Sequence, residues 1–147
     1  VQDAAYLVIV PLIAPDTPPL QKNPVFLYCE DRFQKPNPFK PDIAVDISKV
    51  LEQKFHAMAA HESQFFEWLP WTSGTLQNVP AGEKERLNWL STVRKPVIQP
   101  AIRESLIKWY GTEKANKTVA AEAFEICEYG RRPSDEEIRT LFPMLGQ

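Results

Sequence analysis

The residues that come nearest to a catalytic motif are the run His-Glu-Ser-Gln-Phe at 61–65. In zinc proteases a His-Glu-x-x-His string places two imidazoles four residues apart on one helix face. Here the second position is Phe65, and the only other histidine, His56, lies about 140° around a helix from His61. We therefore predict that this chain alone holds no metal ion and binds no cofactor.

Nucleophilic catalysis and phosphate binding lack their usual motifs as well. The sequence has no Gly-x-Ser-x-Gly elbow, and neither Cys29 nor Cys127 stands beside a histidine. Its five glycines form no phosphate-binding loop. We therefore expect no complete catalytic site and assign no catalytic residue.

Polar residues beside an apolar helix stripe are the remaining candidates. Helical spacing places Ala57, Ala60, His61, Gln64 and Trp68 on one face, where small side chains let a ligand or another backbone come close. On one interpretation, His61 and Gln64 are hydrogen-bonded to a neighbouring loop. On the other, Gln64 or His61 supports an active site that a separate segment completes.

Four aromatic residues have two interpretations each. Trp68 and Trp71 have the ring chemistry to stack on a sugar, although packing against neighbouring helices is the more common role. Phe33 and Phe39 suit a substrate lip, but a loop held down by two aromatic anchors is more frequent.

Two further pairs carry weaker signals. Glu122 and Glu125 are three apart in a predicted strand, so their side chains point to opposite faces and do not suit an acid–base pair. Cys29 and Cys127 each lie in an apolar run, and we predict that both are reduced core residues.

The elements that would position these residues alternate between helices and strands. We predict strands at 25–29, 43–45 and 120–127, and helices at 3–12, from Asp46 to about Phe66, at 83–93, at 101–110 and after Ser134. The first of these helices has a buried strand as its alternative. Asp46 is placed to cap the long helix, Ser134 and Glu137 form a capping box, and 69–82 is predicted to be a loop. The alternation indicates an α/β fold that forms part of a larger sheet.

Composition excludes several classes of protein. With 147 residues, 44% hydrophobic and 24% charged, the chain has ordinary globular usage and suits a single domain or part-domain, residues 1–147. A net charge of -2 predicts no nucleic acid and no membrane surface as a partner. We expect a cytoplasmic protein.

Three strings taken together resemble the C-terminal half of the LmbE-like, PIG-L deacetylase family. They are Pro-Asp-Ile-Ala-Val-Asp-Ile at 41–47, Lys54 with Ala-Met-Ala-Ala-His-Glu-Ser-Gln at 57–64, and Ala-Glu-Ala-Phe-Glu at 121–125. The opening Val-Gln-Asp-Ala-Ala-Tyr at 1–6 looks like the helix that follows the family's His-Pro-Asp-His segment. The resemblance covers most of the chain except 80–115, which looks like a helical insertion.

The resemblance implies the C-terminal portion of a Rossmann-like, three-layer α/β fold and a zinc-dependent removal of N-acetyl groups from amino sugars of the N-acetylglucosamine type. The family's zinc ligands lie in an Ala-His-Pro-Asp-Asp motif and in the His-Pro-Asp-His segment, and neither string occurs in this sequence. Residue 1 is Val, so we expect an N-terminal remainder of the same enzyme as partner. The resemblance also implies a supporting role for Gln64 near the metal, with His61 as the second candidate.

A non-catalytic structural or binding module that pairs with a separate N-terminal chain is the alternative. A half-fold with an open strand edge is expected to associate, as a homo-oligomer or an aggregate, when its other half is missing.

Overall fold

A computed structural model describes residues 2–146, which form an α/β fold with helices α1 to α7 and three strands. The chain divides into two compact units. We call residues 2–45, 99–117 and 122–146 the sheet unit, and residues 46–98 and 118–121 the helical unit.

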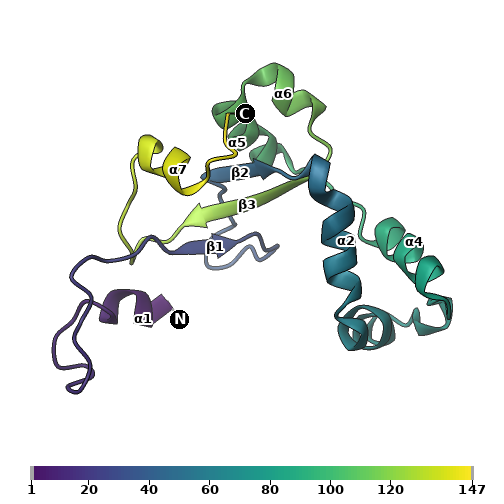
Figure 1. The fold of residues 1–147 in the computed structure, drawn as a ribbon, viewed down its shortest axis with the longest axis horizontal. Helices are drawn as coiled ribbons and strands as arrows, with labels where there is room; N and C mark the ends of the chain where they lie inside the picture. Colours follow the sequence, from purple (N-terminus) through teal and green to yellow (C-terminus); the bar gives the residue numbers. More distant parts are fainter. Residues whose placement is uncertain (1, 147) are drawn as a thin grey trace. The chain divides into compact units, whose positions relative to one another are not determined.

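The sheet has the strand order β1-β3-β2, with β1 at Leu27–Cys29, β3 at Ala121–Ile126 and β2 at Ile43–Asp46. Strand β1 is antiparallel to β3, with Leu27 opposite Ile126 and Cys29 opposite Phe124. Figure 1 shows β3 between its two neighbours, with its arrow pointing opposite to theirs. All three predicted strands are present within the predicted ranges or one residue beyond them.

Helices α5 and α7 complete the core of the sheet unit. Helix α5 (Pro100–Tyr110) packs on α6 (Thr112–Lys117), and its buried Trp109 donates its indole N–H to the carbonyl of Asp42 at 2.9 Å. Arg139 of α7 (Asp135–Leu141) lies 5.2 Å from the centre of the Trp109 ring. The predicted capping box at the start of α7 is confirmed, because the Ser134 and Glu137 side chains each accept a backbone N–H of the other residue.

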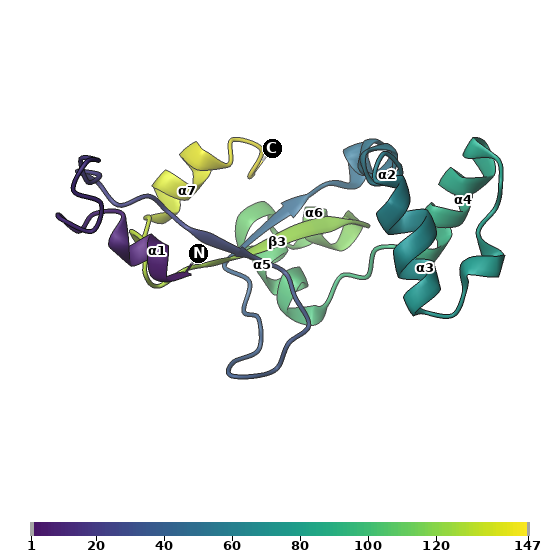
Figure 2. The ribbon, with the colours of Figure 1, turned by 90° about the horizontal axis from the view of Figure 1, so that it is seen from below.

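The helical unit is built from α2 (Leu51–Ala59), η2 (Ser63–Trp68), α3 (Leu69–Thr72) and α4 (Glu83–Val93). The short 3-10 turns η1 (Ser48–Val50) and η3 (Leu76–Asn78) precede α2 and α4. Figure 2 shows α2 and α4 side by side. Phe55, Phe66 and Leu90 form their shared core.

The predicted continuous helix from Asp46 to Phe66 is wrong. After Ala59 the helix is interrupted at Ala60 and His61, and it resumes as the π-helix η2. The carbonyl of His61 accepts N–H groups three and four residues on, from Gln64 and Phe65, whereas the carbonyl of Gln64 accepts the Leu69 N–H five residues on. Periodicity cannot reveal such a change, because the apolar residues keep nearly helical intervals.

Two other predicted boundaries need correction. Helix α1 (Gln2–Leu7) ends at Leu7 rather than Leu12, because the ring of Pro11 would clash with the carbonyl four residues earlier. The predicted loop 69–82 contains α3, whose first turn accommodates Pro70, since the first helical positions need no N–H donor.

The helices predicted at 83–93 and 101–110 are confirmed as α4 and α5, with α5 one residue longer. They fall in different units, and the insertion at 80–115 remains a prediction. Between residues 2 and 146, no helix has the length and apolar character needed to cross a bilayer.

Candidate functional site

An open groove of about 620 Å³ lies along η2 and α3 in the helical unit. Its lining consists of Ser63, Gln64, Glu67, Trp68, Trp71 and Leu76. The groove therefore contains Gln64, one of the two predicted site residues, together with Trp68 and Trp71, the two residues predicted as candidates for stacking on a sugar.

The spacing of the lining residues follows from the helix. Positions 63–64, 67–68 and 71 recur at intervals of three to four residues, so η2 and α3 present them on one side. Sequence reasoning missed Ser63, Glu67 and Leu76 as groove residues. The same interval, extended from Gln64 just past the predicted helix end at Phe66, is the signal that would have found Glu67.

Both groove tryptophans are largely exposed, contrary to the more common interpretation, which had them packed against neighbouring helices. Trp68 is 56% exposed and Trp71 is 69% exposed. Trp89 instead lies against Phe66, with ring centres 6.2 Å apart, and it occupies the packing position next to the core. Trp68 and Trp71, by contrast, each keep more than half of their surface exposed.

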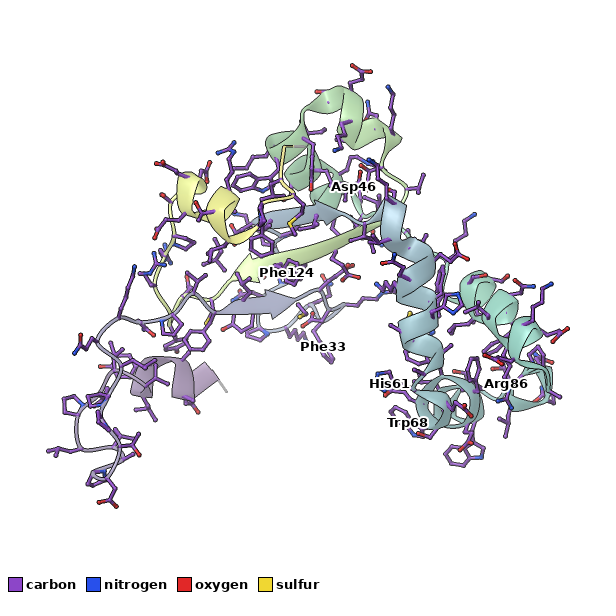
Figure 3. All side chains as sticks on the ribbon, in the orientation of Figure 1. Phe33, Asp46, His61, Trp68, Arg86 and Phe124 are labelled. Atoms are coloured by element: carbon purple, nitrogen blue, oxygen red, sulfur yellow. The ribbon has the colours of Figure 1, made fainter. Side chains whose placement is uncertain are left out.

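The side chains of Gln64 and His61 are exposed, and in the described part of the chain neither is hydrogen-bonded to a neighbouring loop. Within residues 2–146 neither side chain makes a hydrogen bond, so the interpretation that tied them to a loop is not what the structure shows. His61 is exposed at the junction of α2 and η2 and does not line the groove. Figure 3 labels His61 and Trp68 at the same end of α2.

The junction before α2 is held by a small polar network. The Asp46 carboxylate accepts the Ser48 N–H at 2.9 Å and the Ser48 hydroxyl at 2.6 Å. The prediction that Asp46 caps the helix is nevertheless wrong, because the N-cap of η1 is Ile47 and that of α2 is Val50, neither with a side-chain cap bond. The Ser48 hydroxyl in turn accepts the N–H groups of Val119 and Ala120, at 3.0 and 3.3 Å. These bonds account for Asp46 as a structural residue.

A comparison with models of known protein families, with characterised proteins and with solved structures found no match to this chain.

The residues that the structure describes do not fit a zinc site. In the part of the chain that the structure describes, no group of three or more His, Cys, Asp or Glu side chains could hold a metal ion. His56 and His61 are both exposed on the helical unit. A zinc ion would need ligands from another segment, and we derive no catalytic step through it.

A second hollow, of about 830 Å³, lies under the 31–41 loop of the sheet unit. Both Phe33 and Phe39 line it, but Phe33 is 74% exposed and does not anchor the loop as predicted. Glu125 also lines it, with its carboxylate accepting the Lys40 N–H at 2.9 Å. That bond gives Glu125 a structural role in fixing the loop.

One of the two cysteine predictions is wrong. Cys127 is buried, whereas Cys29 is exposed, because it ends β1 at the edge of the sheet. The Cys127 sulfur lies 3.1 Å from the Tyr28 hydroxyl, and this hydrogen bond, aided by desolvation, raises the pKa of Tyr28 to about 12. The shift favours the neutral form of the Tyr28 phenol.

Proposed function

We propose that this chain is the C-terminal part of a zinc-dependent hydrolase that removes N-acetyl groups from an amino-sugar substrate of the N-acetylglucosamine type. In this proposal the chain is part of a Rossmann-like fold and the enzyme is cytoplasmic. The metal ligands come from an N-terminal remainder. The three strings at 41–47, 57–64 and 121–125 are the basis of the proposal.

Gln64 is the observation that carries the proposal on this chain. Its side chain is exposed, lines a groove and has no hydrogen-bond partner within residues 2–146. A carboxamide carries both a donor and an acceptor, so it can orient a polar group of a substrate or of a metal ligand brought by another segment. His61 is exposed close by in sequence and is the second candidate for such support.

The first test is intact mass and zinc content of the protein purified from its native source. We expect a polypeptide or complex that includes an N-terminal part, with zinc near one per complex. A lone 16.8 kDa chain without zinc would favour the binding module that pairs with a separate chain.

The second test addresses Gln64 in that zinc-containing protein, with acetate release from an N-acetylglucosamine-type substrate as the readout. Gln64→Ala is expected to lower kcat/KM by about tenfold, the loss of one oriented hydrogen bond of about 1.4 kcal/mol. Gln53→Ala is the matched control, because Gln53 is an exposed glutamine of α2 outside the groove. Equal rates for both variants would remove Gln64 from the site.

A further inference from the structure

The groove on η2 and α3 combines flat apolar surfaces with polar side chains that have no partners in the described chain. Trp68 and Trp71 are more than half exposed. Ser63, Gln64 and Glu67 make no side-chain hydrogen bond or ion pair anywhere in residues 2–146. Exposed indoles are costly to leave in water, and unpaired polar groups beside them add directional recognition.

We propose that this groove binds a neutral sugar unit and requires no acetyl group on it, with a pyranose ring stacked on Trp68 or Trp71. The axial C–H face of such a ring is apolar, while its rim carries hydroxyl groups. The Gln64 amide and the Glu67 carboxylate supply the acceptors, and the Ser63 hydroxyl and the amide supply the donors that this rim requires. A single class of ligand satisfies both halves of the groove.

Charge and size narrow the ligand further. Glu67 is the only ionisable residue of the lining, so the groove disfavours phosphate, sulfate and uronate groups. Its volume of about 620 Å³ lies within the range of small-molecule sites. A neutral oligosaccharide therefore fits better than a charged one.

A proline-rich peptide is the main rival, since such peptides also dock on exposed aromatic side chains. The groove is less suited to it, because three of its six lining residues are polar and unpaired. Sugar binding in the groove goes beyond the proposed function. Both involve Gln64, but sugar binding needs neither zinc nor an acetyl group. Failure of one therefore leaves the other standing.

The test is a titration of the full 147-residue chain with cellotriose. Binding is monitored in NMR spectra through the indole N–H signals of the four tryptophans. We expect the Trp68 and Trp71 signals to shift with saturation. The signals of Trp89, which packs beside the core, and of Trp109, which is hydrogen-bonded to Asp42, should stay in place.

Variants distinguish ring stacking on the tryptophans from non-specific binding. Trp68→Ala and Trp71→Ala are expected to weaken cellotriose binding by about tenfold each, while Trp68→Phe, which keeps a flat ring, retains most of it. Phe33→Ala is the matched control, since Phe33 is an equally exposed aromatic residue in the other unit. Because the replaced rings are exposed, all four variants are expected to fold.

Three results would overturn the inference. They are the absence of any shift at the highest soluble cellotriose concentration, unchanged binding in both tryptophan-to-alanine variants, and saturable binding of a proline-rich peptide without a response to sugar. Glucuronate binding as tight as that of cellotriose would contradict the role given to Glu67.

Discussion

Replacing Arg86 by methionine is expected to loosen the helical unit, because one guanidinium holds three partners there. Its Nε donates to the carbonyl of Pro80 at 2.9 Å, and its plane lies 5.3 Å from the centre of the Phe66 ring. It also lies 3.8 Å from the carboxylate of Glu62. Arg86 thus ties the segment before α4 to η2, which carries the groove.

The size of the effect follows from these contacts. The hydrogen bond from a charged donor that is one-third exposed contributes about 1 kcal/mol. Stacking on Phe66 adds about 0.5 to 1 kcal/mol. The ion pair is long and its Glu62 partner is 72% exposed, so it adds at most a few tenths, and roughly 2 kcal/mol is expected in total. Methionine keeps the apolar stem, so the loss reports the guanidinium alone.

Amide hydrogen exchange of α2 and α4 is the appropriate assay, because it reports the opening of this unit separately from the sheet unit. Arg86→Met should lower the free energy of opening by about 2 kcal/mol, and Glu62→Gln by less than about 0.5 kcal/mol. A Glu62→Gln loss equal to that of Arg86→Met would refute the reasoning, since the exposed ion pair would then be the dominant contact.

Three further predictions concern the polar contacts of both units. Ser48→Ala removes the acceptor of two backbone N–H groups and should lower the free energy of unfolding in urea by about 1 to 2 kcal/mol. Ser63→Ala, at an exposed serine, should change that free energy by less than about 0.5 kcal/mol. Cys127→Ala should lower the pKa of Tyr28 from about 12 toward its ordinary value of 10.0, measured from its ring chemical shifts. In the unsubstituted chain the stabilisation linked to that phenol is complete below pH 10 and is lost as pH rises toward 12, because the unfolded chain releases this proton first. The pKa of Glu137 is lowered below 4.5 by the Ser134 N–H and by the nearby Arg131 guanidinium. The stabilisation that the Glu137 carboxylate contributes is therefore present above pH 4.5 and is lost as the pH falls below it. Below pH 4.5 the chemical shifts of α7 should report the same fraying that Glu137→Gln shows at neutral pH.

The elements that local chemistry specifies were predictable from the sequence. The capping box of Ser134 and Glu137 needs only two side chains three residues apart, and it is present as predicted. The strands at 43–46 and 121–126 follow from short apolar runs between turn residues. The end of α4 before Pro96 and the start of α5 at Pro100 follow from the restrictions that proline places on its own and the preceding residue.

Part of the candidate site was also within reach of the sequence. Helical spacing placed Gln64 and Trp68 together, and both line the groove. His61 was placed on the same face but lies outside the groove, because the interruption at Ala60 and His61 and the π-helical spacing that follows change the rotation of η2 relative to α2.

The exposure of individual side chains was decided by the tertiary structure alone. Trp68 and Trp71 are exposed, whereas Trp89 packs beside Phe66 at the core of the helical unit, and a sequence cannot show which of several tryptophans is buried. Cys29 is exposed at the end of the edge strand β1, whereas Cys127, directly after the central strand β3, is buried. Spacing along one chain determines which residues share a face, while burial depends on what packs against that face from distant parts of the sequence.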